Sequence, residues 1–208
     1  MILPIVAYGD PILKQRAKEI SSSSKDLEIL LKNMWETMYA ANGVGLAAPQ
    51  VGKSLRLFIV DGSPFSVEAS LTEDEKNELK GFKKVFINPK ILQKSDDLEN
   101  FNEGCLSIPD VRGDVTRPTT IKIKYQNQYF KEITEHISGF PSRIVQHEYD
   151  HLEGILFTDK LSALKKKLLK NKLLKISRGN INVDYLMKFD NNRSVSYTHL
   201  TLPTNRCV

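Results

Sequence analysis

The sequence predicts an α+β fold in which antiparallel β-sheets pack around a central helix that carries an HExxH motif, with a helix near the N-terminus and a Lys-rich helix near the C-terminus. Apolar side chains recur at helical spacing in two stretches, residues 27–39 and 139–154. Apolar and polar side chains alternate near residues 55–59 and 120–125, as in strands buried on one side. The strands are grouped and do not alternate with helices, which favours α+β over a βαβ arrangement.

The first helix is predicted from seven apolar residues that share one face: Leu27, Leu30, Leu31, Met34, Trp35, Met38 and Tyr39. Ser23 or Ser24 can cap its start, and Asn42-Gly43 can end it. A strand follows at 55–59. Residues 66–80 are polar and acidic, so we expect them to form an exposed excursion between strands.

The remaining elements are, in order, a strand at 85–87 that Asn88-Pro89 ends, strands at 120–125 and about 129–137, a helix between Gly139 and Gly154, and a Lys-rich helix at about 160–172. Pro141 suits the first turn of the helix that follows Gly139, because its missing N–H is not needed there.

The composition is typical of a globular protein, with 40% hydrophobic and 26% charged residues among 208. No apolar run approaches the roughly 20 residues of a membrane helix, and the N-terminus lacks the layout of a secretion signal. We therefore expect a cytoplasmic protein with neither a membrane nor DNA as a partner. Residues 1–189 are predicted to form a single domain. Residues 190–208 have no clear period, which predicts a disordered or non-native tail.

The segment His147-Glu148-Tyr149-Asp150-His151 is the most informative part of the chain. Two histidines four residues apart on a helix point the same way and can hold one metal ion, while the glutamate between them can act as general base. The alternative, two surface histidines in register by chance, is disfavoured because Ile144, Val145 and Leu152 predict a buried helix.

A catalytic site of this kind needs a third protein ligand. The position of the third histidine of metzincins is Phe157 here, and residues 155–208 contain no glutamate that could complete a thermolysin-like site. Asp159, Asp184, Asp190 and His199 remain as downstream candidates. Upstream, Cys105 offers a thiolate, a strong soft ligand, and the chain has only one other cysteine with which it could form a disulfide.

A third cluster, GVGLAAPQ at 43–50, follows the end of the first helix. Its glycines permit close backbone approach, and its small residues would let a substrate chain lie against the backbone. The amide of Gln50 could donate to a developing oxyanion. A helix cap followed by a tight turn is the simpler explanation of this run when it is taken alone.

Taken together, GVGLAAPQ at 43–50, EGCLS at 103–107 and QHEYDHLEG at 146–154 resemble the motifs of the peptide deformylase family, complete and in the family's order. The resemblance covers the chain from Ile2 to about Phe189. It implies a metal-dependent hydrolase that removes the formyl group from the N-terminal formyl-methionine of newly made proteins and releases formate. The implied partners are N-formyl-methionyl nascent polypeptides.

The resemblance also implies residue roles. Cys105, His147 and His151 would bind one divalent metal, Fe²⁺ first, with Zn²⁺, Ni²⁺ or Co²⁺ as substitutes. Glu148 would transfer the proton. Gln50 and the N–H of Leu106 would form the oxyanion hole, and Gly45 with its neighbouring backbone would pair with the substrate as an added strand. Arg112 would contact the peptide.

An apolar pocket for the methionine side chain is expected from Val44, Phe140 and Ile144, with Phe101 as a further candidate. These positions follow from helix geometry and from their nearness to the motifs.

Basic residues crowd the stretch from Lys160 to Arg178, and a solvated helix face is the simplest explanation of this run. The resemblance to bacterial deformylases, whose C-terminal segment helps them to reach nascent chains, implies that residues 160–178 contact ribosomal RNA or protein. Two alternatives to the hydrolase stay open at this point. One is a general metallopeptidase, which the missing downstream ligand disfavours. The other is a ribosome-associated binding module with a structural metal site, although such sites are usually closed by four protein ligands.

Overall fold

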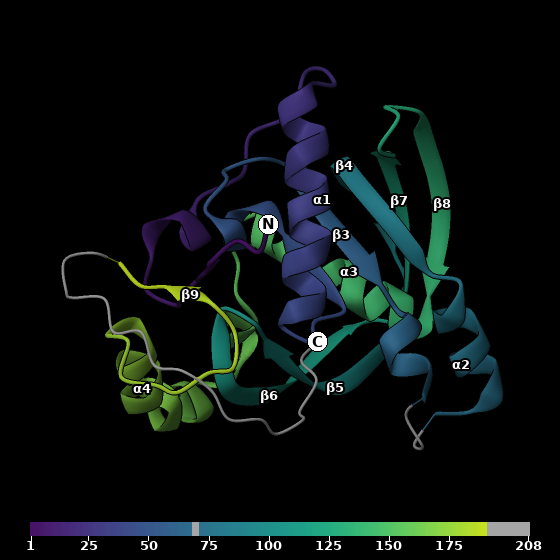
Figure 1. Cartoon of the computed structure of the whole chain (residues 1–208). Coiled ribbons are helices and arrows are strands. Elements are labelled where there is room, and N and C mark those ends of the chain that lie inside the picture. Colours follow the sequence, from purple (N-terminus) through teal and green to yellow (C-terminus); the bar gives the residue numbers. More distant parts are fainter. Residues whose placement is uncertain (68–70, 191–208) are drawn as a thin grey trace.

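The computed structural model describes residues 1–67 and 71–190, and it confirms the predicted α+β class with antiparallel sheets (Figure 1). The helices are α1 (Lys25–Ala40), α2 (Glu73–Lys80), α3 (Gly139–Leu152) and α4 (Ala163–Ser177). The strands are β1 (Ile5–Val6), β2 (Gly45–Ala47), β3 (Leu57–Asp61), β4 (Lys83–Lys94), β5 (Leu98–Cys105), β6 (Ile108–Pro118), β7 (Thr120–Gln126), β8 (Glu132–Ser138) and β9 (Met187–Lys188). No described helix has both the length and the apolar character needed to cross a membrane.

Five antiparallel strands form the main sheet in the order β2-β3-β4-β7-β8, so β2 lies at one edge. The two faces of β3 pack against different helices. Phe58 and Val60 join the apolar cluster that contains residues of α3, whereas Leu57 and Ile59 join the cluster that contains residues of α1. This strand is therefore buried on both faces, and not on one face only as the alternation predicted.

Helix α1 packs along the sheet through the apolar face that its period indicates. Leu27, Leu31, Met34 and Met38 are buried, and the side chain of Ser24 accepts a hydrogen bond from the N–H of Leu27 at the helix start. Helix α3 lies on the other face of the sheet, in the middle of the molecule (Figure 1). This arrangement buries most of the α3 surface and places its polar residues inside the protein.

The hairpin of β5 and β6 was not predicted, because its inward positions are not consistently apolar. Glu103 and Arg117 are buried on it, at 0% and 3% exposure, together with Cys105. Buried charges interrupt the alternation of apolar and polar residues by which a strand is identified in a sequence. The hairpin packs beside α3 and so brings Cys105 to the helix that carries the two histidines.

The prediction that Asn88-Pro89 ends a strand was wrong. Strand β4 continues to Lys94, and the pairing with β7 shifts between Ile87 and Lys90. Asn88 has a φ of 50°, in the left-handed region, and its side chain donates to the carbonyl of Ile20 and accepts from the N–H of the same residue. A bulge thus accommodates the Asn-Pro pair within the sheet.

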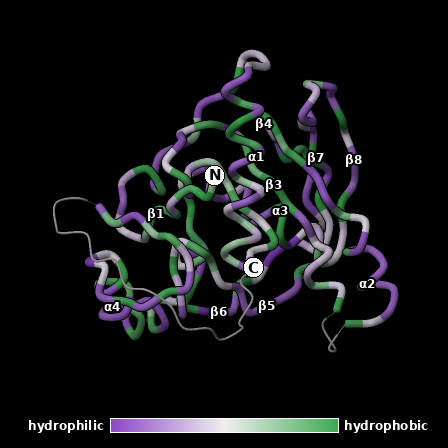
Figure 2. The backbone as a smooth tube through the Cα atoms, in the orientation of Figure 1, coloured by the Kyte–Doolittle hydropathy of each residue, from purple (hydrophilic) through white to green (hydrophobic). Residues whose placement is uncertain are grey.

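The excursion predicted at 66–80 is only partly exposed. Thr72 and Glu75 form a capping box that starts α2, and Figure 2 shows this helix as almost entirely hydrophilic. Leu71 and Leu79 are nevertheless buried in the cluster between the sheet and α3. Two leucines therefore anchor this polar segment to the core.

Beyond α4 the chain turns back, and β9 pairs with β1 in parallel (Figure 1). Helix α4 begins and ends later than the predicted 160–172, and Leu173 and Ile176 bury its inner side. The predicted tail, apart from Asp190, lies outside the described residues.

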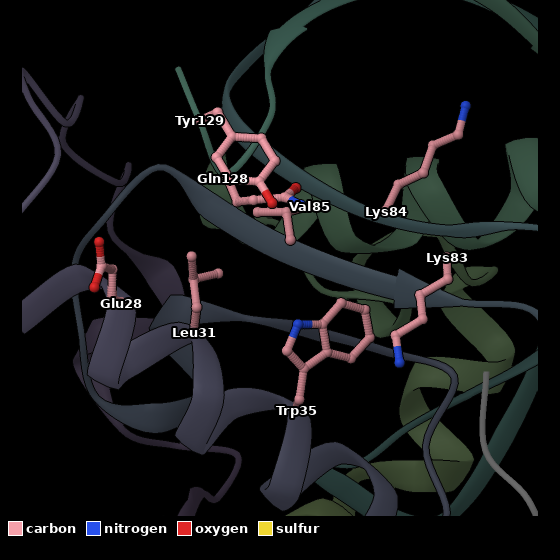
Figure 3. A pocket seen from close by; sticks show the side chains of 8 residues that line it. All are labelled: Glu28, Leu31, Trp35, Lys83, Lys84, Val85, Gln128 and Tyr129. Carbon is pink, nitrogen blue, oxygen red and sulfur yellow. The ribbon is translucent and has the colours of Figure 1, made fainter. Parts of the chain in front are cut away.

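A surface groove of about 480 Å³ runs between α1 and the start of β4 (Figure 3). The indole of Trp35 lines the groove, and the ammonium of Lys83 lies 4.7 Å from the centre of that ring. Tyr129 rises from the turn between β7 and β8 at its far end. None of the three metal-ligand candidates lines this groove.

Candidate metal centre

Three buried side chains with metal-binding atoms converge between β5 and α3. Cys105 is the last residue of β5, whereas His147 and His151 lie one turn apart on the inner side of α3. Their exposures are 2%, 3% and 1%. One ligand atom from each residue lies within 4.8 Å of the other two, and Cys105 Sγ is 3.3 Å from His151 Nε2.

This arrangement fits one metal ion. With a metal–sulfur distance of about 2.3 Å and a metal–nitrogen distance of about 2.0 Å, a tetrahedral centre separates the sulfur and nitrogen atoms by about 3.5 Å. The spacing of Cys105 and His151 agrees with that value. Three protein ligands also leave a fourth position for water, as catalytic sites require.

Glu103 lies behind the histidine pair and was not assigned a role from the sequence. Its carboxylate is 3.0 Å from His147 Nδ1, which leaves Nε2 of that histidine for a metal. Burial alone would lower the pKa of His147, but hydrogen bonds with Cys105 and Glu103 raise it well above its ordinary value. A ligand histidine must be neutral, so a cation bound here would displace that proton.

Two arginines neutralise Glu103. Arg117 donates to both carboxylate oxygens at 2.6 and 2.9 Å, and Arg143 donates to one of them at 3.1 Å. Burial by itself would raise the pKa of Glu103, but the hydrogen bonds from Arg117 and His147 lower it below its ordinary value. Asp150, also on α3, pairs with Arg117 at 2.6 Å. His147 is thus linked through Glu103 and Arg117 to a largely buried network of ion pairs.

Glu148 faces β2 from the same turn of α3. A Cβ atom at Gly45 would lie 2.3 Å from Glu148 Oε1, so only glycine fits beside this carboxylate. Burial raises the pKa of Glu148 to about 7. Among residues 1–67 and 71–190, no group hydrogen-bonds to its Oε2 atom. A carboxyl group with this pKa can take up and release a proton near neutral pH.

The orientation of Gln50 is set by the backbone. Its Oε1 accepts a hydrogen bond at 2.8 Å from the N–H of Ala47, which can only donate. The amide nitrogen must therefore point the other way, where it lies 3.5 Å from Cys105 Sγ and 3.4 Å from Ser107 Oγ. The donor end of Gln50 thus faces the sulfur of Cys105.

The other predicted site residues fall into two groups. Val44 and Ile144 are fully buried in one apolar cluster, against which Phe140 and Phe101 pack with their rings 5.1 Å apart. Leu106 follows Cys105 directly and is buried, at 3% exposure. Arg112 is exposed on β6, where its Nε donates to Asn102 Oδ1 at 2.8 Å, and it lies outside the apolar cluster.

Comparison with known proteins agrees with these features. Residues 2–167 match the model of the polypeptide deformylase family. A peptide deformylase of Christiangramia forsetii is 56% identical over 191 residues, which cover 92% of this chain and 97% of that protein. A peptide deformylase of Flavobacterium johnsoniae is 52% identical over 189 residues, which cover 91% and 96%.

Among solved structures, a peptide deformylase from Legionella pneumophila is similar, with a TM-score of 0.74 and 34% identity over 86% of this chain and 98% of that one. A Plasmodium falciparum peptide deformylase, in complex with an inhibitor, has a TM-score of 0.71 and 34% identity over 84% and 99%. The chain belongs to the polypeptide deformylase family, hydrolases with a single catalytic metal that remove the formyl group from the N-terminal formyl-methionine of new proteins.

Proposed function

We propose that α3 is the central, HExxH-bearing helix of a deformylase site in which Cys105, His147 and His151 hold the metal and Glu148 transfers protons. The convergence of these three buried ligand atoms carries the proposal. A divalent ion bound there would act as a Lewis acid that lowers the pKa of water and polarises the formyl carbonyl.

The remaining chemistry belongs to side chains of this protein. Glu148 accepts a proton from the attacking water as its oxygen adds to the formyl carbon. Gln50 Nε2 and the N–H of Leu106 donate hydrogen bonds to the carbonyl oxygen as it becomes negative. Glu148 then gives its proton to the leaving nitrogen, the carbon–nitrogen bond breaks, and formate and a methionyl amine are released.

The substrate is held by β2 and by the apolar cluster. Within the described part of the chain, β2 pairs with β3 alone and lies at the sheet edge, so an extended peptide can add to it at Gly45. Val44, Phe140 and Ile144 would receive the methionine side chain, with Phe101 as a further candidate. Their shared apolar cluster supports this assignment. Arg112, exposed on β6, would contact the peptide beyond the methionine.

Replacing Gly45 by alanine is expected to lower kcat at least about tenfold, because the added methyl group would displace the carboxylate of Glu148. Steady-state formate release measures this effect. Gly81→Ala is the matched control, since a Cβ atom there meets nothing within 4 Å. Equal activity of Gly45→Ala and wild type would contradict the assigned contact.

The thiolate and two imidazoles suit Fe²⁺, Zn²⁺, Ni²⁺ and Co²⁺, and we propose Fe²⁺ as the metal in the cell. The test is formate release from an N-formyl-methionyl tripeptide by protein purified without oxygen and reloaded with each ion in turn. The Fe²⁺ form is expected to be among the most active, and to lose its activity in air. No formate from any fully loaded form would refute the proposed site, and cleavage of internal peptide bonds would instead indicate a metallopeptidase.

We also propose that residues 160–178 contact the ribosome in the bacterial cytoplasm. Leu164 and Leu168 are both 70% exposed on α4, among its lysines. Charge reversal at Lys165, Lys166 and Lys167 is expected to weaken co-sedimentation with ribosomes at moderate salt. The same reversal at Lys90, Lys122 and Lys131 is the control for net charge, and equal behaviour of the two triple variants would refute the contact.

Residues 1–189 are proposed to form a single catalytic domain. The packing of Phe189 on the cluster that contains Cys105 supports a domain that extends to this residue. A protein shortened to residues 1–189 is expected to keep its formate release and its Tm. A substantial loss of either would show that residues 190–208 belong to the folded unit.

A further inference from the structure

The turn that follows Cys105 is held from three sides. The N–H of Tyr8, next to β1, donates to the carbonyl oxygen of Ser107 at 2.8 Å. Gln50 Nε2 reaches the hydroxyl of the same serine at 3.4 Å. The third contact comes from the far end of the chain, where the hydroxyl of Tyr185 donates to the carbonyl oxygen of Leu106 at 2.7 Å.

Tyr185 belongs to a segment that lies outside the part of the chain shared with the family model. That match ends at residue 167, whereas residues 178–189 return from α4 toward the N-terminal strand (Figure 1). The segment is firmly attached immediately after Tyr185. The N–H groups of Ile5 and Ala7 donate to the carbonyls of Leu186 and Lys188, both at 2.8 Å. These hydrogen bonds hold the backbone next to Tyr185 in place, and so fix the position of its phenol ring relative to Leu106.

Apolar packing strengthens the same attachment. Met187 and Phe189 pack on the cluster that contains Cys105 and Ile108. The ring of Tyr185 packs on the neighbouring cluster that contains Leu106. The side chain of Leu106 is itself wedged against Gly43, where a Cβ atom would lie 2.8 Å from it. The motif at 43–50 thus restricts the side chain of Leu106, and Tyr185 restricts its carbonyl group.

We propose that Tyr185 is a positioning residue for deformylation, because its hydroxyl holds the Cys105-Leu106-Ser107 turn in the geometry that the reaction needs. The inference rests on the roles proposed above for Cys105 and Leu106. A carbonyl in a largely buried position that loses its donor carries a free-energy cost, which a change of backbone conformation can relieve. A rotation of the backbone at Leu106 would move the N–H of Leu106 and, one residue earlier, Cys105 Sγ. The first shift would disturb the oxyanion hole, and the second would disturb a metal ligand.

The test is Tyr185→Phe in the full-length protein, which removes one oxygen atom and keeps the ring. Tyr125→Phe is the matched control, because the hydroxyl of Tyr125 donates to Glu135 at 2.7 Å on β8, away from the turn. Three quantities are measured on each Co²⁺-loaded protein. They are kcat and KM for an N-formyl-methionyl tripeptide, and the rate of Co²⁺ release to excess chelator without substrate.

Tyr185→Phe is expected to lower kcat about three- to tenfold with KM changed less than about twofold, and to release Co²⁺ severalfold faster. Tyr125→Phe should leave all three values at wild-type level. The proposal is refuted if Tyr185→Phe matches wild type in both kcat and Co²⁺ release, or if both variants lose activity equally. An error in the proposed deformylase function would give a different result, because wild type would then release no formate. The rate of Co²⁺ release would still show whether Tyr185 stabilises the turn.

Discussion

Glu148→Gln is expected to reduce kcat for formate release by about 10²- to 10⁴-fold while one metal ion per chain stays bound. The amide occupies the same space beside Gly45, so the packing of α3 against β2 is kept. It can neither accept a proton from water nor return one to the leaving nitrogen. Steady-state kinetics at saturating peptide, with metal content measured on the same samples, gives the result.

The stability of this variant offers an independent check. Burial raises the pKa of Glu148 to about 7, because the buried site disfavours the ionised carboxylate. The free energy of unfolding of wild type therefore falls as the pH rises from the ordinary pKa of glutamate through 7. Glutamine at this position does not ionise, so the variant does not lose this stability. The Tm of metal-free Glu148→Gln at pH 8 is expected to equal or exceed that of wild type. Retention of more than about a tenth of the wild-type kcat would remove Glu148 from the proton-transfer role.

Glu103→Gln is expected to weaken metal binding by about 10- to 100-fold and to lower the free energy of unfolding by about 3–5 kcal/mol. The first effect follows because His147 loses the carboxylate that orients its ring. The second follows because Arg143 loses its buried carboxylate partner and Arg117 keeps only Asp150. Competition with a chelator for Co²⁺ and urea unfolding of the metal-free protein measure the two effects separately.

The stabilising effect of Glu103 has a defined pH dependence. The pKa of this carboxyl group is lowered in the folded protein, so its contribution is complete above the pKa of an unfolded glutamate and is lost as the pH falls below it. The difference in unfolding free energy between wild type and Glu103→Gln should therefore shrink in acid. Glu99→Gln, an exposed change on the same strand, is the control. Metal affinity within about twofold of wild type would contradict the orienting role.

The sequence predicted those parts of the site whose geometry is local. His147, Glu148 and His151 lie within two turns of one helix, so their relative placement follows from helical spacing alone. The α+β class and most element positions also follow from local periods. The hairpin of β5 and β6 escaped prediction because Glu103 and Arg117 occupy inward positions where apolar residues are expected. Strand β4 was predicted too short, because the bulge at Asn88 depends on its contact with Ile20.

The sequence by itself thus determined the residue types that carry the chemistry and the helix that presents two of the three ligand candidates. Only the tertiary structure decided which distant groups meet them. Cys105 approaches His151 across 46 residues, and Glu103 approaches His147 across 44. Gly45 meets Glu148, and Tyr185 meets Leu106, by the same kind of long-range contact. Such pairs depend on how the hairpin, the sheet and the C-terminal segment pack around α3, and no local period of the chain encodes that packing.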